Sequence, residues 1–502
     1  MKKVGITHPK GLYVLFLTEM WERFSYYGMR AMFVLYLMKC LLMSEAQAAQ
    51  LYGSYTGLVY LTPLLGGFLA DRYWGNRRSV LLGSLVMAFG QLLMFYSACV
   101  YTSAQASWLM YIGLGLLILG NGFFKPNISS LVGDLYEKSD SRRDTAYSIF
   151  YMGVNMGAMI APLWCGWVSN GESPEGFKWS FLSAAIGMII GGLIFYLFKN
   201  KYLVNPKGEP VGVKPAPAAR KSDKSDKSEK RSPAFIVGMA MLCLLLFAAF
   251  RLGGNDYIGA AIYSVSIAVP LMIILDRSLS PIERKRIVVI YAITFFVIFF
   301  WAAYEQSGAS LTFFAEKQTD RTLGDYTVPV SYFQSVNPIL IVLLVPLFNV
   351  MWGFLRRHGF EPAATMKQAM GLALLGVGYL VISFGVGQAT TAEKVSMMWL
   401  LTLYFMLTMG ELFLEPIGLS IVNRLSPARF SSLLMSVWFL SSAAANKLAG
   451  VLSSLYPTDD KVTSFLGYEI ADLSDFFMIF ALMGFASAAL LAVISRKLEK
   501  MM

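Results

Sequence analysis

Charged residues are scarce in this 502-residue sequence, and their scarcity excludes most soluble architectures. Asp, Glu, Lys and Arg make up 15% of the chain, whereas apolar residues make up 56%. An average soluble domain carries about 25% charged residues, and a soluble chain of this length would need them to cover several wide surfaces. Apolar runs of about 20 residues, long enough to cross the hydrocarbon core of a membrane, recur instead. The composition predicts an all-α polytopic membrane protein rather than a soluble enzyme.

Cysteine and histidine are also rare. The four cysteines stand far apart with no CxxC pair, which argues against a disulfide framework or a structural metal site. Both histidines, His8 and His358, fall in predicted loops, so proton chemistry inside the membrane would have to use carboxylates. The chain contains no Walker A, HExxH or GxSxG motif. We therefore expect neither an enzyme nor an ATP-driven pump, and no cofactor or metal.

Charged or turn-rich breaks divide the apolar runs into fourteen predicted helices, arranged as two sets of six around a different middle. The middle contains a linker whose run of Lys, Ser, Asp and Glu over 220–231 cannot bury enough apolar surface to order itself. A predicted helical hairpin follows this linker. The expected domains are an N-terminal bundle (1–200), a charged cytoplasmic linker (201–232), an inserted transmembrane hairpin (233–276) and a C-terminal bundle (277–502). The expected helices are 11–38, 47–70, 79–100, 107–133, 144–169, 177–198, 233–250, 257–275, 287–314, 331–355, 366–386, 395–423, 430–455 and 473–495.

Lys and Arg gather on one side of the predicted topology. Of the 42, 31 lie in the segments on the side of the N-terminus, seven on the other side and four within helices. Because basic residues are retained on the cytoplasmic side of a membrane, we expect both termini to be cytoplasmic in a cell (inner) membrane. The net charge of +11 then reflects topology and not nucleic-acid binding. The first apolar run is too long and too charged for a signal peptide, so we expect it to stay in the membrane.

The first predicted helix contains charges that membrane helices normally avoid. Glu19, Glu22, Arg23, Tyr26 and Arg30 project within a stripe about 100° wide on a helix. Each ionisable group at membrane depth costs about 2.5 kcal/mol or more, and such groups are usually paired, cavity-facing and functional. These charges could simply neutralise one another between packed helices, but a buried ion pair adds little net stability. The stripe therefore favours the lining of a wet cavity.

Further isolated charges differ in sign between the two halves. Lys125 lies in the fourth predicted helix, whereas Glu305, Glu411 and Glu415 lie in the second half. A basic first half and an acidic second half would suit a substrate with a carboxylate at one end and an ammonium at the other. From charge alone, an anion or a cation also remains possible.

Several motifs identify a family. The stretch EMWERFSYYG at 19–28 resembles the ExxERFxYYG signature of the proton-dependent oligopeptide transporters, within the major facilitator superfamily, at every fixed position. Residues 71–78 (DRYWGNRR) resemble the cytoplasmic gating motif of that superfamily. The resemblance covers essentially the whole chain, and the inserted hairpin is what bacterial members carry. The other matching segments are GNGFFKPN at 120–127, FYMGVNMG at 150–157, WAAYEQ at 301–306, FQSVNP at 333–338, and GEL at 410–412 with PIGL at 416–419.

The resemblance implies a major facilitator fold of two six-helix bundles plus the inserted hairpin. It implies a symporter that imports di- and tripeptides with protons by alternating access, surrounded by lipids, monomeric and without nucleic-acid partners. Carried over by position, Arg23 and Lys125 would hold the peptide carboxylate and Glu411 its amino terminus. The other implied substrate-binding residues are Tyr26, Tyr27, Tyr60, Asn155, Trp301, Asn337 and Trp438, and the implied proton-coupling residues are Glu19, Glu22, Glu305 and Arg30, the last two as a salt-bridge gate.

Two other functions remain to be distinguished. The same fold could carry nitrate or another small anion, although Glu411 would repel a purely anionic cargo. A receptor or scaffold would show no substrate flux. Glu415 departs from the family, whose members more often have a small polar residue there. An extra acid one turn from Glu411 could favour cationic side chains or change the number of protons moved.

Overall fold

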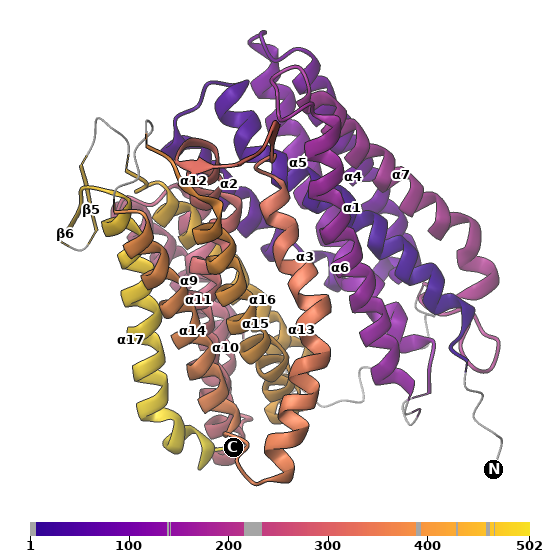
Figure 1. The fold of residues 1–502 in the computed structure, drawn as a ribbon. Coiled ribbons are helices and arrows are strands. Elements are labelled where there is room, and N and C mark those ends of the chain that lie inside the picture. Colours follow the sequence, from indigo (N-terminus) through magenta and orange to yellow (C-terminus); the bar gives the residue numbers. More distant parts are fainter. Residues whose placement is uncertain are drawn as a thin grey trace. The chain divides into compact units, whose positions relative to one another are not determined.

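The computed structural model describes residues 7–137, 140, 142–214, 233–387, 393–427, 430–457, 462–465 and 467–502. The chain is almost entirely helical (Figure 1). Helices occur at each of the fourteen places where the sequence predicted them, and most ends agree within a few residues. The charged run of the expected linker, 220–231, lies outside the described residues.

The first half comprises α1 (Lys10–Lys39), α2 (Glu45–Leu61), α3 (Pro63–Leu69), the π-helical turn η1 (Ala70–Trp74), α4 (Asn76–Cys99), α5 (Gln105–Asp134), α6 (Arg142–Val168) and α7 (Phe177–Tyr202). The inserted hairpin is formed by α9 (Pro233–Leu252) and α10 (Tyr257–Ile274). The second half comprises α11 (Pro281–Tyr304), the 3-10 turn η2 (Glu305–Gly308), α12 (Ser310–Lys317), α13 (Tyr332–Arg357), α14 (Ala364–Gly385), α15 (Met397–Leu425), α16 (Ser431–Ser453) and α17 (Leu473–Glu499).

Short strands occur only in connections among the described residues. Strand β1 (Thr319–Asp320) pairs in parallel with β4 (Val395–Ser396). Two antiparallel pairs are β2 (Thr322–Leu323) with β3 (Tyr326–Thr327), and β5 (Thr463–Phe465) with β6 (Tyr468–Ile470). The strands are two or three residues long, so they close loops and build no core.

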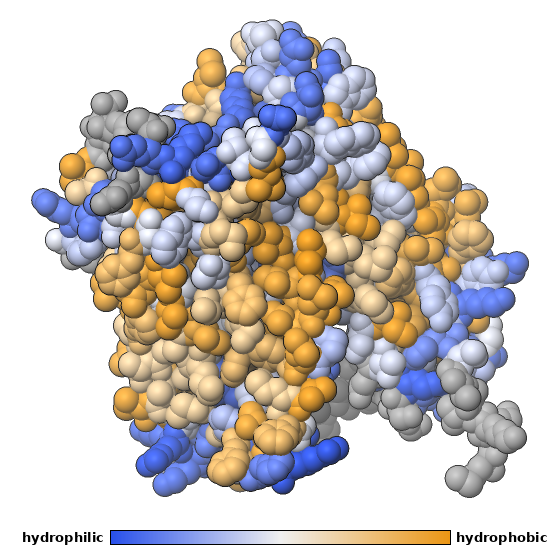
Figure 2. All heavy atoms as spheres, in the orientation of Figure 1, coloured by the Kyte–Doolittle hydropathy of each residue, from blue (hydrophilic) through white to orange (hydrophobic). Residues whose placement is uncertain are grey.

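Ten of the described helices are long and apolar enough to cross a membrane. Helix α13 shows why such a helix needs lipid around it. Only 17% of its most apolar 18-residue stretch is buried, and Leu343, Leu347 and Val350 are more than half exposed. Apolar side chains cover the middle of the visible face, and hydrophilic side chains gather toward its ends (Figure 2). This distribution is that of a multi-pass membrane protein.

The helix expected at 47–70 is broken. Helix α2 ends at Leu61, and Pro63 starts α3 at its first position. Proline lacks an N–H and clashes with the preceding turn of a helix, so it cannot continue α2, but it is tolerated in the first turn of a new helix. The Thr62 hydroxyl fixes the break by donating to the Ile118 carbonyl of α5 at 2.9 Å.

The helix expected at 287–314 is also interrupted, by η2. Gln306 holds this turn: its amide nitrogen donates to the carbonyls of Ala302 and Ala449 at 2.9 and 3.2 Å. Its oxygen accepts from the hydroxyls of Ser310 and Ser453 at 2.5 and 2.6 Å. The interruption is therefore a specific, hydrogen-bonded feature that joins the end of α11 to α16.

By its contacts the chain divides into two compact units. The first draws its described residues from Met1–Met43, Leu61–Lys227 and Val328–Ile339, and the second from Ser44–Tyr60, Ser228–Thr327 and Leu340–Met502. Two segments thus pack outside the half that their sequence position suggests. Nearly all of α2 packs in the second unit, and the start of α13 packs in the first.

Within the first unit, α1 packs against α6 and α7, and α4 packs against α5 and α7. Within the second, α14 packs between α15 and α17, and α10 of the hairpin lies against α9 and α16. The charge stripe of α1 is therefore held by its neighbours in the first unit, and the hairpin is part of the second.

Candidate functional site

The centre of the candidate site is a guanidinium shared by two carboxylates on α1. Arg23 Nε lies 2.5 Å from Glu22 Oε2 and 3.1 Å from Glu19 Oε1. All three side chains are at least 95% buried. The four-residue spacing places Glu19 on the same face of α1 as Arg23, and Glu22, the preceding residue, reaches the same Nε. The stripe read from the sequence therefore forms a compact ion cluster.

Aromatic rings extend the stripe toward the next turns of α1. The Arg23 guanidinium carbon lies 5.4 Å from the centre of the Tyr26 ring, and that of Arg30 lies 5.8 Å from the Tyr27 ring. The two tyrosines pack edge to face at 5.2 Å. A cation within about 6 Å of a ring is attracted by the negative face of the ring. Each ring therefore gives one of the two guanidiniums a favourable contact.

Lys125 adds a second positive charge from α5. It is half-buried and lies close enough to Glu19 to interact with it electrostatically. Pro126, the next residue, has no N–H and so cannot donate to the carbonyl of Gly122 within α5. One turn earlier, Asn121 is 2% exposed, and neither its Oδ1 nor its Nδ2 has a partner among the described residues.

Two amides complete the predicted set of the first unit. Asn155 on α6 is buried, and its Nδ2 donates to the Tyr151 carbonyl at 3.0 Å. Asn337 on α13 is half-buried and precedes Pro338. Its segment packs in the first unit although it comes from the second half of the sequence.

The second unit holds the remaining predicted residues. Glu305 is 4% exposed and begins the η2 turn. Trp301 lies one turn earlier, and its buried Nε1 has no hydrogen-bond partner among the described residues. Glu411 is buried on α15, and Trp438 is 2% exposed on α16. Tyr60 is half-buried near the end of α2.

The structure thus brings together Glu19, Glu22, Arg23 and Lys125. It places Glu305 and Glu411 in the other unit, so the pairing of Arg30 with Glu305 stays a prediction. Glu415, the departure from the family motif, is half-buried on α15, one turn after Glu411.

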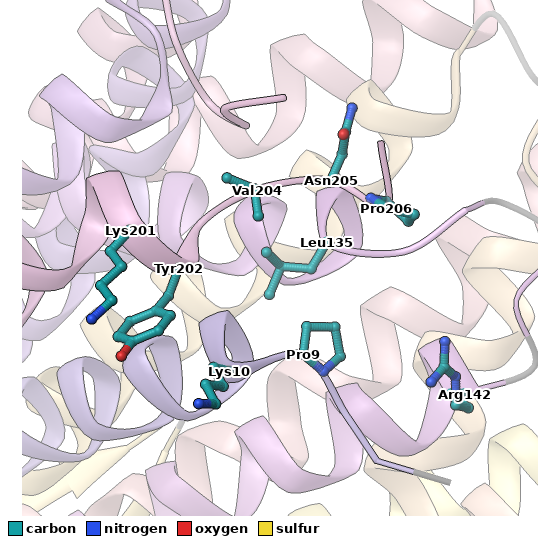
Figure 3. Close-up of a pocket in the computed structure, with 9 residues that line it drawn as sticks. All are labelled: Pro9, Lys10, Leu135, Arg142, Lys201, Tyr202, Val204, Asn205 and Pro206. Carbon is teal, nitrogen blue, oxygen red and sulfur yellow. The ribbon is translucent and has the colours of Figure 1, made fainter. Parts of the chain in front are cut away.

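A separate hollow of about 300 Å³ opens on the first unit (Figure 3). Lys10, Lys201 and Tyr202 lie on one side of it, and Arg142 lies on the other. It sits at the start of α1 and the end of α7, more than two helical turns from Glu19. The hollow is therefore distinct from the charge cluster of α1.

A sequence profile described as the POT family matches residues 77–468. The chain belongs to the POT family. Peptide transporter YePEPT of Yersinia enterocolitica is 33% identical, over 90% of this chain and 89% of its own. The di-/tripeptide transporter of Lactococcus lactis subsp. cremoris is 31% identical, over 100% and 98%. A crystal structure of peptide transporter POT in complex with alafosfalin is 31% identical and covers 99% of this chain and 97% of its own, with a TM-score of 0.81.

Membership of the POT family confirms the predicted major facilitator fold with its inserted hairpin. This POT-family chain is a membrane transporter and not an enzyme. Within the described part of the chain, no three His, Cys, Asp or Glu side chains are grouped so that they could hold a metal ion.

Sequence reasoning assigned no role to the buried side chains of Lys447 and Glu172, or to the half-exposed side chain of Asp256 that caps α10. Lys447 was visible as a lone charge in a predicted helix, and Asp256 follows a Gly-Gly-Asn turn that often precedes a helix N-cap. Glu172 carries no such signal, because it lies in a loop and its partners are about 160 residues away.

Proposed function

We propose that this chain is a proton-coupled symporter that imports di- and tripeptides by alternating access. The observation that carries the proposal is the buried cluster of α1, in which one guanidinium is shared by two carboxylates within the signature stretch of the POT family. Relatives named as di-/tripeptide transporters cover nearly the whole chain, which supports the same class of substrate here.

Coupling follows from competition for Arg23. While Glu22 is ionised, it accepts from Arg23 at 2.5 Å and neutralises part of the positive charge. Protonation of Glu22 removes its negative charge, so Arg23, which still pairs with Glu19, and Lys125 attract a peptide carboxylate more strongly. Occupancy by peptide then depends on the proton gradient, because protonation and binding favour the same state.

The remaining roles are assigned by the family motifs. Glu411 would bind the peptide ammonium, so that one ligand engages acidic and basic groups from both halves of the sequence. Glu19 and Glu305 would take part in proton transfer, with Arg30 as the partner of Glu305 in a gate. The backbone amides of the peptide would bond to Asn155 and Asn337, and its side chains would contact Tyr26, Tyr27, Tyr60, Trp301 and Trp438.

We further propose that the protein lies in the cell (inner) membrane as a lipid-embedded monomer with both termini in the cytoplasm. The excess of Lys and Arg on the side of the N-terminus supports this orientation. Lys10 and Lys201, at the hollow of Figure 3, would then face the cytoplasmic surface. Protons serve as the coupling ion, and no other cofactor is required.

The test is uptake of a labelled dipeptide into proteoliposomes under an inward proton gradient. Glu22→Gln should abolish gradient-driven accumulation but retain counterflow exchange, since a permanently neutral side chain removes coupling and not binding. Lys125→Ala should lose both, and Lys199→Ala, a half-buried lysine at the end of α7, serves as the matched control. Unchanged accumulation in both site variants would refute the mechanism. Inhibition of uptake by excess nitrate but not by unlabelled dipeptide would favour an anion carrier.

A further inference from the structure

Lys447 is a buried ammonium whose partners come from two other elements. It lies on α16 with 3% of its side chain exposed. Its Nζ donates to Asp256 Oδ2 at 2.9 Å and to Ser54 Oγ at 2.7 Å. Asp256 precedes α10 of the inserted hairpin, and Ser54 lies on α2. One side chain therefore joins the hairpin, α2 and α16.

Both carboxylate oxygens of Asp256 accept hydrogen bonds, although 47% of its side chain is exposed. Oδ1 accepts from the Gly259 N–H at 2.9 Å and so caps the first turn of α10. Oδ2 accepts from Lys447 and lies 3.3 Å from the Ser54 hydroxyl, whose closer acceptor is the Gln50 carbonyl at 2.8 Å. The same residue thus starts the hairpin's second helix and anchors it to α16. Removal of its charge would leave a buried ammonium without its countercharge, which proteins tolerate poorly.

Helices α2 and α16 touch backbone to backbone beside this cluster. A Cβ added to Gly53 would lie 2.7 Å from the Gly450 Cα and 2.9 Å from the Asn446 carbonyl oxygen. A Cβ added to Gly57, one turn later, would lie 2.8 Å from Ile262 Cδ1 of α10. Helix α2 is therefore held between α16 and the hairpin, and only glycine fits at its point of closest approach.

Helix α2 packs in a different unit from α3, which follows it directly in the sequence. Residues 44–60 pack in the second unit, whereas the chain from Leu61, with the break at Pro63, packs in the first. Alternating access requires contacts between packed helices to be exchanged for others. Contacts that hold α2 on α16 therefore oppose any conformation in which α2 leaves α16.

We propose that Lys447, Asp256 and Ser54 form a latch through which the inserted hairpin holds α2 against α16 and controls the conformational step of transport. The hairpin is then a regulatory element of the cycle and not a passive lipid-facing addition. The three residues are positioning residues, since they act through α2. The consequence for transport rests on the proposed function, but the conformational consequence does not.

The direct test is the distance between spin labels on α2 and α16, measured by double electron–electron resonance in a background with the four native cysteines replaced by alanine. Labels at Gln50→Cys on α2 and at Ser454→Cys, the residue directly after α16, report their separation. Asp256→Asn keeps a side chain able to cap α10 but removes the charge. We expect the population at longer distance to rise at least about fivefold, the lower range of typical coupling between conformational states.

Three further variants separate a latch from a general packing defect. Lys447→Met, which leaves the Asp256 cap of α10 in place, should give the same shift. Asp325→Asn, an exposed loop acid of the same unit, should leave the distribution unchanged. If the charge variants fail to fold, Ser54→Ala, which removes one hydroxyl, should still lengthen the distance to a smaller extent.

An unchanged distance distribution in folded Asp256→Asn or Ser54→Ala would overturn the latch. Dipeptide counterflow, measured on the same variants, should change at least about fivefold, because it needs only the conformational step. If the wild type moves no dipeptide but the distances shift as expected, the proposed function fails and the latch stands. If transport is intact and the distances do not move, the latch fails alone.

Discussion

The buried carboxylate of Glu172 joins the loop after α6 to the start of α13. It is 1% exposed, and its oxygens accept from the backbone N–H groups of Val330 at 3.0 Å and Ser331 at 2.7 Å. These groups lie just before Tyr332, the first residue of α13, where N–H groups lack partners within the helix. A hydrogen bond to a charged group contributes about 1.5–3 kcal/mol, and a negative charge at a helix N-terminus about 0.3–1 kcal/mol.

Glu172→Gln keeps one acceptor oxygen, replaces the other with an N–H₂ group that faces a donor, and removes the charge. We therefore expect local stability at the start of α13 to fall by about 2 kcal/mol. This loss corresponds to about 30-fold faster exchange of the two amide protons, since each 1.4 kcal/mol is a factor of about ten.

Hydrogen–deuterium exchange of a peptide covering 328–334 measures this change directly. Glu175→Gln, an exposed acid of the same loop, should leave the exchange rate unaltered. Peptides from the tightly packed pair α4 and α5 should also remain unchanged, because they share no partner with Glu172. Exchange within twofold of wild type in Glu172→Gln would refute the reasoning.

Two smaller predictions concern the second unit. The buried Tyr379 hydroxyl donates to the Ala303 carbonyl at 2.6 Å near the end of α11. Tyr379→Phe should therefore lower the free energy of unfolding by about 1 kcal/mol. A midpoint of thermal unfolding in detergent equal to that of the wild type would contradict this. Hydrogen bonds from Arg356 and, to a smaller extent, from Lys367 lower the pKa of Glu361 from 4.5 to about 2. Because the pKa is depressed in the folded state, the stabilisation should be complete above about pH 4.5 and disappear as the pH falls toward 2. The difference in unfolding midpoint between wild type and Glu361→Gln should follow that profile.

The helices were predictable because the length of an apolar run is set by the membrane and not by the rest of the fold. Their interruptions were less so. Pro63 stands in the sequence, yet prolines are common within membrane helices, and Pro126 and Pro162 do not end theirs. The η2 turn depends on Gln306 contacting α16, about 140 residues away, and no local pattern reports such a contact.

Within the charged clusters, contacts along one helix could be predicted from the sequence, whereas contacts between distant segments could not. The cluster around Arg23 belongs to one helix: the four-residue spacing places Glu19 on its face, and Glu22 is its neighbour in the sequence. Lys447 and Asp256 are 191 residues apart, and their pairing follows only once α10 lies on α16. Tertiary contacts therefore decide whether an isolated charge within the membrane can bind substrate or instead stabilises the packing of helices.

These two arrangements suit different tasks. Two carboxylates that pair with Arg23 are carried by the same helix, so one of them can be protonated, or exchanged for a ligand carboxylate, without separating any helices. Lys447 is buried and has partners on two other elements, so its ammonium is separated from both of them only when packed elements part. A charge of the first kind can respond to protons and peptide at each step of a cycle. A charge of the second kind responds to conformation, and a change in its strength alters how readily the conformations interconvert and not what is bound.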